Sequence, residues 1–112
     1  MKRIEAIIGP LKLDGVKAGV LQTGARGMTI SDIRELGRLS SRREAHRDPG
    51  RKLEFAPKVH IQIVAPDDMV AAIVEAIVRA SRAGRASDDR IIVSPVSDAV
   101  RIRTGEHGNE AV

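Results

Sequence analysis

The stretch VHIQIVAPDDMVAAIVEAIV, residues 59–78, decides the fold because it joins a strand pattern directly to a helix pattern. Residues 59–64 are the clearest strand of the chain. Pro66, Asp67 and Asp68 then predict a helix start, since acidic residues are stabilising at the positive end of the helix dipole. The apolar stripe of this helix recurs at i, i+3, i+4, i+7 and i+8: Val70, Ile73, Val74, Ile77 and Val78. Gly84 is expected to close the helix.

The N-terminal half carries the same two patterns. Residues 2–8 alternate, with Ile4, Ala6 and Ile8 on one face, and predict a strand that Gly9 and Pro10 end. A helix follows between residues 14 and 24, with apolar residues at helical spacing. Further strands are expected at residues 28–36 and 91–93, and a short fifth at 99–102. The order βαββαβ predicts a single α+β domain over residues 1–112 with the ferredoxin-like, split-βαβ arrangement.

Composition limits the function classes. The chain has 112 residues, a net charge of +4 and no cysteine, which excludes disulfides, a thiol nucleophile and cysteine-ligated metals. Phe55 is the sole aromatic residue, so the stacking platforms of single-stranded nucleic-acid binders are missing and no nucleic-acid partner is expected. No apolar run approaches the length of a membrane helix and no signal peptide is visible, so we expect a cytoplasmic protein without membrane insertion.

A long polar segment separates the second and third strands. Residues 37–56 show no apolar period and hold six basic and three acidic side chains, a charge of +3. A loop of this length inside a small domain is usually functional or disordered, and composition leaves both readings open.

The sheet is expected to keep one face uncovered, because two helices on one side leave the other side free. Ile7 and Val64 give the second face apolar groups in addition to those of Ile4 and Ile63. Self-association through the open face is therefore predicted.

No catalytic or metal-binding constellation is visible. The histidines are His46, His60 and His107, without HxxxH spacing, and neither a G-x-S-x-G nor a Walker A motif occurs. His60 lies among apolar strand residues and is expected to be a hydrogen-bonded structural side chain. We therefore expect neither an enzyme nor a metal site.

Anion binding has better support. Arg101 and Arg103 alternate along the expected C-terminal strand, so both are predicted to project to the same side. Arg85 and Arg90 flank the polar segment 83–89, and Arg38 stands at the root of the long segment. Guanidinium groups suit phosphate oxygens, so a polyphosphate ligand is one interpretation; ordinary surface charge is the other.

Several strings of the chain together resemble the PII signal-transduction proteins. They are MKRIEAIIGPLKLD (1–14), GMT (27–29), FAPKV (55–59), VAPDD (64–68), IVSPV (92–96) and VRIRTGE (100–106). The resemblance implies a homotrimer of ferredoxin-like subunits with ATP and ADP sites in the clefts between them. It makes residues 37–55 the T-loop, which reaches a partner protein such as a transporter, a channel or a metabolic enzyme.

The resemblance also implies roles for single residues. Gly27, Met28 and Thr29 would meet the adenine, with Ile7 and Val64 lining its pocket. The phosphates would lie on Gly37, Arg38, Arg90, Arg101 and Arg103 and on the phosphate loop 83–90, which includes Ser87, Asp88 and Asp89. Lys58 would pair with a carboxylate of 2-oxoglutarate. Arg42, Arg43, Arg47, Arg51 and Lys52 would present positive charge to the partner, and residues 101–112 would form the C-terminal segment.

Departures from the family pattern change the expected chemistry. Leu39 stands where a Gln usually helps to hold Mg²⁺ and 2-oxoglutarate, and it offers no oxygen, which argues against Mg-ATP-dependent 2-oxoglutarate sensing. Asp89 replaces a glycine of the phosphate loop, so its charge is expected to weaken a triphosphate more than ADP or AMP. Arg51 stands where many members carry a modified Tyr, which excludes that modification.

The sequence therefore predicts a PII-type regulator that binds ATP or ADP, with AMP as a further candidate, at trimer interfaces. Two alternatives stay open. One is a constitutive trimeric interaction module that has lost nucleotide sensing, and the other is a PII-like sensor of another small anion such as bicarbonate.

Overall fold

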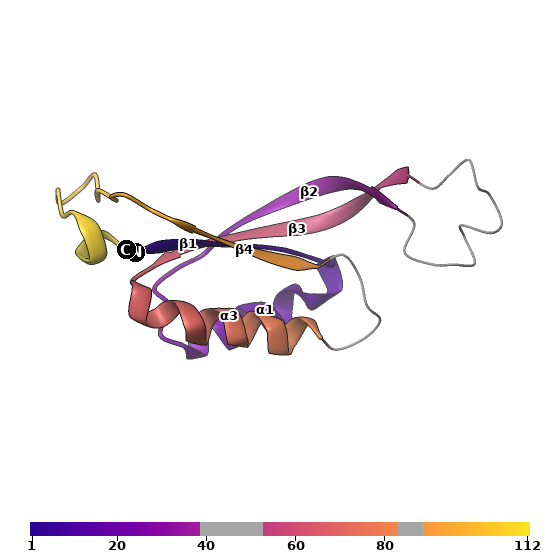
Figure 1. Cartoon of the computed structure of the whole chain (residues 1–112), viewed down its shortest axis with the longest axis horizontal. Coiled ribbons are helices and arrows are strands. Elements are labelled where there is room, and N and C mark those ends of the chain that lie inside the picture. Colours follow the sequence, from indigo (N-terminus) through magenta and orange to yellow (C-terminus); the bar gives the residue numbers. More distant parts are fainter. Residues whose placement is uncertain (39–52, 83–88) are drawn as a thin grey trace.

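The computed structural model describes residues 1–38, 53–82 and 89–112 (Figure 1). The strands are β1 (Lys2–Ile8), β2 (Thr29–Arg38), β3 (Leu53–Ala65) and β4 (Arg90–Pro95). The described residues also form two longer helices, α1 (Leu13–Gln22) and α3 (Asp67–Ser81), and two short 3₁₀ helices, η1 (Pro10–Lys12) before α1 and η3 (Gly108–Ala111) near the C-terminus. The order of strands and helices is βαββαβ, as the sequence predicts.

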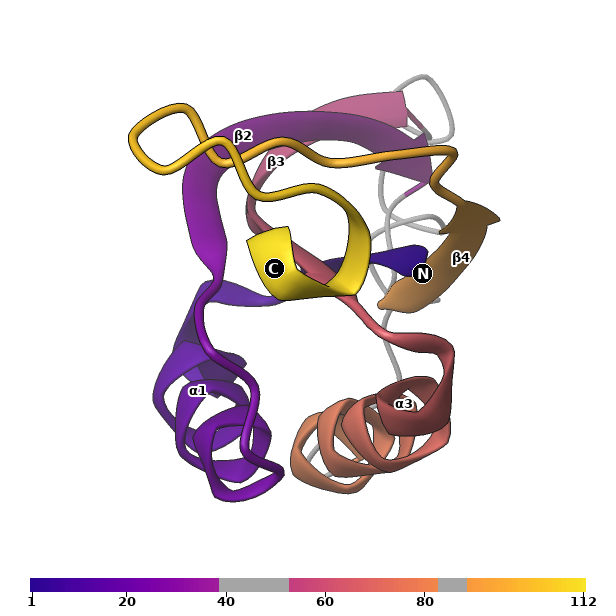
Figure 2. The same ribbon diagram turned by 90° about the vertical axis from the view of Figure 1, so that its left-hand side faces the viewer.

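The strands form one antiparallel sheet in the order β2-β3-β1-β4. Cross-strand partners share a face of the sheet, so the register fixes both faces. Ile4 pairs with Ile63 and Val93 on one face, whereas Ile7 pairs with His60 and Arg90 on the other. Figure 2 shows α1 and α3 side by side against one face, which confirms the expected α+β, ferredoxin-like arrangement with an uncovered second face.

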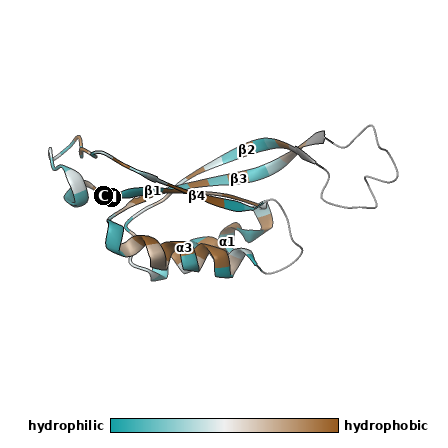
Figure 3. Ribbon diagram, viewed as in Figure 1, coloured by the Kyte–Doolittle hydropathy of each residue, from teal (hydrophilic) through white to brown (hydrophobic). Residues whose placement is uncertain are grey.

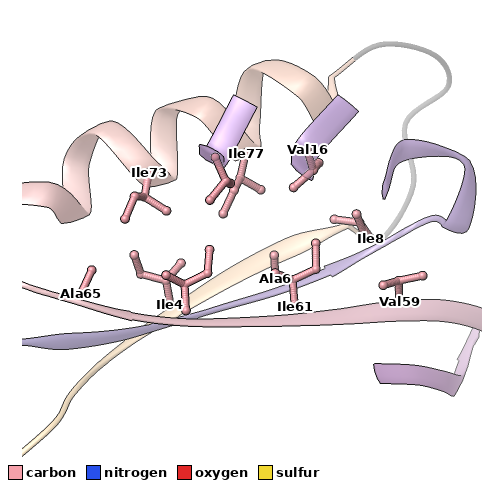
Figure 4. Packing of buried hydrophobic residues seen from close by; sticks show 11 residues of the cluster. Ile4, Ala6, Ile8, Val16, Val59, Ile61, Ala65, Ile73 and Ile77 are labelled. Atoms are coloured by element: carbon pink, nitrogen blue, oxygen red, sulfur yellow. The ribbon is translucent and has the colours of Figure 1, made fainter. Parts of the chain in front are cut away.

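The core lies between the sheet and the two helices. Figure 4 shows Ile73 and Ile77 of α3 pointing toward Ile4 and other strand residues, and both are at most 1% exposed. Val16 and Val20 supply the buried stripe of α1. Along β3, the buried residues Val59, Ile61 and Ile63 alternate with the partly buried residues His60 and Gln62, the period expected of a half-buried strand, and Figure 3 shows both hydrophobic and hydrophilic residues along this strand. Burial of aliphatic groups alone therefore builds this core.

Helices α1 and α3 approach closely because small residues face each other. A Cβ placed on Gly19 would lie 3.6 Å from the Cβ of Ala76, and one on Gly15 would lie 3.9 Å from that of Ala80. Gly24 ends the turn after α1 with φ +89°, a conformation that glycine adopts without steric cost. The amino group of Met1 contacts Asp67 at the start of α3 and holds the pKa of its carboxyl below the usual value.

The long segment is bounded by more strand than the sequence predicts. The β2–β3 ladder continues through Leu36↔Phe55 to Arg38↔Leu53, so both ends of the predicted loop 37–55 are strand, and residues 39–52 lie outside the described part. Leu36 and Phe55 are 53% and 66% exposed. Because this ribbon extends beyond the helices (Figure 1), neither face is buried and no hydrophobic period marks it.

The expected fifth strand at 99–102 is wrong. An isolated bridge joins Val100 to His107, and residues 102–104 form a turn. The chain therefore folds back on itself here and does not pair with the sheet. Helix α3 ends at Ser81, and the predicted stop at Gly84 lies in the undescribed segment 83–88. Within the described ranges, no helix is long and apolar enough to cross a membrane.

Candidate functional site

Most of the predicted site residues fall into two groups, one at each end of strands β1 and β4. Ile7, Lys58, Asp89 and Arg90 lie where β1 ends and β4 begins, with Ile7 paired to Arg90. Arg101 and Arg103 lie beyond the far end of β4. Gly27 and Met28 precede β2, whose first residue, Thr29, pairs with Gln62 at the level of Glu5 in β1. Figure 1 shows the C-terminal segment at one end of the molecule and the start of β4 toward the other.

Val64 belongs to the second end of the sheet. It pairs with Arg3, which is four residues before Ile7 along β1. A strand rises about 3.4 Å per residue, so Ile7 and Val64 stand roughly 13 Å apart along the strand direction. The adenine pocket implied by the resemblance is therefore not assembled within one chain.

Asp89 is the centre of a charged cluster at the first end. Its carboxylate accepts a hydrogen bond from Lys12 Nζ at 2.7 Å, and Lys58 Nζ lies 3.3 Å from its second oxygen. The backbone N–H of Gly9 donates to the same carboxylate at 3.2 Å. The three charged side chains are only 11–18% exposed. We call these four residues the Asp89 cluster.

Arg90, the residue after Asp89, forms an ion pair with Glu35 of β2. β2 and β4 are the two edge strands, so this pair links opposite edges of the sheet across its open face. Glu35 is 18% exposed and Arg90 is 47% exposed. Lys58 and Arg90, two cations expected to meet an anionic ligand, thus already contact carboxylates of their own chain, and an incoming anion would compete with those carboxylates.

The second end is organised by a C-terminal loop, residues 98–108. The N–H of Arg101 donates to the carbonyl oxygen of Glu106 at 2.9 Å, and the N–H of Gly105 donates to the carbonyl oxygen of Arg101 at 2.7 Å. Arg101 and Arg103 therefore stand on a turn, and the predicted strand with both side chains on one side is wrong. Their guanidinium groups remain exposed to solvent.

Asp98 closes the base of this loop. Its carboxylate accepts hydrogen bonds from the N–H groups of Ala99 and Gly108, and His107 Nδ1 lies 2.9 Å from Oδ2. The hydrogen bond with His107, followed by those from the backbone, holds the pKa of Asp98 below its usual value. Asp98 thereby fixes the turn that carries Arg101.

A small cavity lies beside the second group. Its volume is about 130 Å³, and its walls include Gly24, Arg26, Val64, Met69 and Val112. The cavity brings together the approach to β2, the end of β3 and the C-terminus. It places apolar contacts next to the residues 27–29 that the resemblance assigns to adenine.

The open face of the sheet carries exposed apolar groups. Ile92 of β4 is 46% exposed, and Ile7, Val64 and Ile33 are partly buried on the same face. His60 Nε2 lies 3.1 Å from Glu5 Oε1 on this face, which confirms its interpretation as a hydrogen-bonded structural side chain. The predicted apolar second face is therefore present.

The remaining residues that the resemblance assigns to the phosphates and to the T-loop lie on β2 or outside the described part of the chain. Gly37 and Arg38 lie on β2, where they pair with Glu54 and Leu53. The structure does not describe the phosphate-loop residues Ser87 and Asp88 or the T-loop cations Arg42, Arg43, Arg47, Arg51 and Lys52. In the ranges that are described, no group of His, Asp and Glu gathers as metal ligands.

Sequence reasoning missed four residues that the structure places at the two ends. Lys12 and Glu35 engage Asp89 and Arg90, and Asp98 and His107 hold the C-terminal loop. The partners of the first pair come from distant parts of the chain, so no spacing marks them. Asp98 alone has a local signal, because an aspartate commonly accepts hydrogen bonds from the backbone just after it.

Comparison with known proteins finds full-length similarity. The family described as Nitrogen regulatory protein P-II matches residues 1–106. The nitrogen regulatory protein P-II of Cereibacter sphaeroides is 47% identical over 112 residues, which cover 100% of both chains. Those of Microchaete diplosiphon and Azospirillum brasilense are 44% and 43% identical over the same length.

Proposed function

Because the chain belongs to the Nitrogen regulatory protein P-II family, a family of signalling proteins, we propose that it binds ADP or ATP between copies of itself. We further propose that the bound nucleotide sets the position of residues 37–55, which contact and regulate a partner protein. A ligand can transmit a signal in this way only if it binds the two loop arrangements with different affinity.

The separation of the predicted nucleotide residues carries this proposal. Arg90 is the first residue of β4, whereas Arg101 lies beyond the end of that strand, which runs from Arg90 to Pro95. The five residue steps from Arg90 to Pro95 alone span about 17 Å, so one chain does not bring Arg90 and Arg101 to the same phosphate group. A head-to-tail contact, in which the first end of one copy meets the second end of its neighbour, would join them.

The open face supports the same assembly. Ile7, Ile92 and Val64 present apolar surface on the side without helices. A head-to-tail contact repeats around a ring when its rotation closes, and a trimer is the ring that the family resemblance implies. Burial of these side chains between copies would stabilise the ring.

The chemistry favours ADP over ATP. The β-phosphate would replace Glu35 on Arg90, exchanging one anion for another at a guanidinium group. A γ-phosphate would add charge beside Asp89 without a further free cation from Lys58, which already contacts that carboxylate. Leu39 contributes no oxygen to a metal, so Mg²⁺ is expected to add little.

Subunit mixing tests the shared site. Arg90→Met and Arg101→Met are each expected to bind ADP at least tenfold more weakly than the unmodified chain, measured by calorimetry. Co-expressed with two different tags, the variants form mixed rings. A site with both arginines forms where an Arg101→Met subunit, which keeps Arg90, lies next to an Arg90→Met subunit, which keeps Arg101. With random mixing of equal amounts, this is the case at about a quarter of the sites.

Recovery of tight ADP binding in the mixed oligomer supports the proposal. Arg79→Met is the matched control, because Arg79 is exposed on α3 and pairs with Glu75 away from both ends. If each variant binds weakly and mixing restores nothing, the two arginines act within one chain and the shared site is refuted. Light scattering of the same samples gives the number of subunits.

A constitutive interaction module is the second candidate. The ion pairs of Lys58 with Asp89 and of Arg90 with Glu35 favour this candidate, since both cations have carboxylate partners without any ligand. In that case, ADP, ATP and AMP give no heat in calorimetry, whereas the oligomer still forms. Partner binding would then be the same with and without nucleotide.

A further inference from the structure

The C-terminal loop, residues 98–108, is closed at its base by one carboxylate. Oδ1 of Asp98 accepts hydrogen bonds from the N–H of Ala99 at 2.9 Å and from the N–H of Gly108 at 3.1 Å, so it joins the two ends of the loop. Nδ1 of His107 lies 2.9 Å from the other oxygen, Oδ2. We call Asp98 and His107 the loop latch.

The backbone of Arg101 is held between the two segments that the loop latch joins. Its N–H donates to the carbonyl oxygen of Glu106 at 2.9 Å, and its carbonyl oxygen accepts from the N–H of Gly105 at 2.7 Å. Next to it, Val100 forms a bridge with His107 itself. Figure 2 shows this segment leaving β4, turning back and ending in η3. The position of Arg101 therefore depends on whether the loop latch is closed.

The two oxygens of Asp98 respond differently to pH. The backbone N–H groups on Oδ1 do not titrate, whereas histidine is the side chain that usually changes its charge between pH 5 and 8. The hydrogen bond with His107, followed by those from the backbone, keeps the pKa of Asp98 below its usual value, so this carboxylate stays ionised over that range. A hydrogen bond between two charged groups is stronger than one with a neutral partner, so the loop latch is tighter when His107 is protonated.

Other charged groups surround the loop latch without contacting His107 in the described structure. Between about pH 6 and 8, arginine, lysine and glutamate side chains do not change their charge. His60, a second histidine, faces Glu5 on the open face of the sheet. The surrounding groups are Arg101, Arg103 and Glu106 of the loop, Glu110 of η3, Lys2 opposite Pro95, Arg26 beside the cavity that Asn109 lines, and the amino group of Met1, which contacts Asp67.

We propose that His107 is a positioning residue for nucleotide binding: by closing the C-terminal loop on Asp98, it holds Arg101 in place for a phosphate group, more firmly when its imidazole is protonated. The inference rests on the proposed nucleotide site and deepens it, because it makes ADP affinity depend on pH. Coupling between two events is reciprocal, so bound ADP also stabilises the closed loop.

The first test is ADP binding by the full chain, measured by calorimetry at about pH 6 and about pH 8. His107→Gln removes the titrating charge, and His107→Lys makes it permanent. ADP and His60 titrate in every variant, so the ratio of the two dissociation constants is compared between variants. The loop latch is exposed, with side-chain exposures of 66% for His107 and 52% for Asp98. Acidification should therefore favour ADP binding roughly 1.5- to 5-fold more in the unmodified chain than in His107→Gln or His107→Lys.

Two further measurements separate positioning from a merely structural role. Without nucleotide, the Arg101 and Gly105 amides should exchange with water more slowly near pH 6 than near pH 8 after correction for intrinsic rates, because both donate inside the loop. His107→Gln should remove this difference. In an Arg101→Met background, His107→Gln should leave ADP affinity unchanged at both pH values.

Equal pH ratios in the unmodified chain and His107→Gln overturn the proposal, and so does amide exchange that is the same with and without His107. An effect of His107→Gln that persists in full without Arg101 also contradicts it. ADP binding that ignores His107 refutes the loop latch and leaves the nucleotide site standing. If the unmodified chain gives no heat with ADP, the nucleotide site itself is refuted.

Discussion

Glu35→Gln is expected to strengthen ADP binding, because Glu35 and a phosphate compete for Arg90. The ion pair is partly exposed, with Glu35 at 18% and Arg90 at 47%. Pairs of this kind contribute roughly 0.2–1 kcal/mol, so removing the competitor should lower the ADP dissociation constant roughly 1.5- to 5-fold. Glutamine keeps the size of the side chain and removes its charge.

A double-mutant cycle by titration calorimetry separates this competition from a general charge effect. Arg90→Met should weaken ADP binding at least tenfold, and Glu35→Gln should have no further effect in that background. Glu75→Gln is the control, since it breaks an exposed ion pair with Arg79 on α3. The reasoning is refuted if Glu35→Gln weakens ADP binding, or if its gain persists unchanged without Arg90.

Four further predictions concern stability, and the first three are measured by urea unfolding. Gly19→Ala should raise the free energy of unfolding by about 0.5–1 kcal/mol, because its Cβ would make an ordinary contact with Ala76 in a helix interior. Gly24→Ala should lower the same free energy by about 1 kcal/mol, because φ there is +89°. Ile77→Ala should lower it by roughly 2–5 kcal/mol, since Ile77 is 1% exposed in the core. Because the pKa of Asp98 is lowered on folding, its contribution to the C-terminal loop is present above about pH 4 and lost as pH falls through the lowered pKa. The Gly108 amide shift should therefore titrate below 3.8, and a midpoint at or above that value would contradict this assignment.

The parts of the fold that could be predicted are those where one face is buried. Ile4, Ala6 and Ile8 alternate because the sheet is covered on one side, and Ile73 and Ile77 recur because α3 buries one stripe. The β2–β3 ribbon around Leu36 and Phe55 has no such asymmetry. Backbone hydrogen bonds between β2 and β3 continue the ribbon there, and such bonds do not require apolar and polar side chains to alternate.

The residue types of the site could be predicted from the sequence, but the ion pairs between these residues could not. Arg90 and Lys58 could be assigned to anion binding from motif positions, but their carboxylate partners are remote in sequence. Lys12 and Asp89 are 77 residues apart, and Lys58 and Asp89 are 31 apart. Such contacts depend on the strand order β2-β3-β1-β4, which brings the start of β4 beside the end of β1. Side-chain periodicity does not encode that proximity.

These pairings change what an anion has to do to bind at the first end of the sheet. Lys12, Lys58 and Arg90 face Asp89 and Glu35, which leaves one positive charge in excess among these five groups. An anion that binds Lys58 or Arg90 would then compete with these carboxylates, and its affinity would be the difference between two ion pairs. A single carboxylate gains little by such an exchange, whereas a phosphate brings more charge and more oxygens to the guanidinium fork of Arg90. The excess of one charge also limits how much a third phosphate can add. We therefore expect selectivity among nucleotides to be decided at Glu35 and Asp89, the carboxylates that have to give way, more than at the basic residues that attract them.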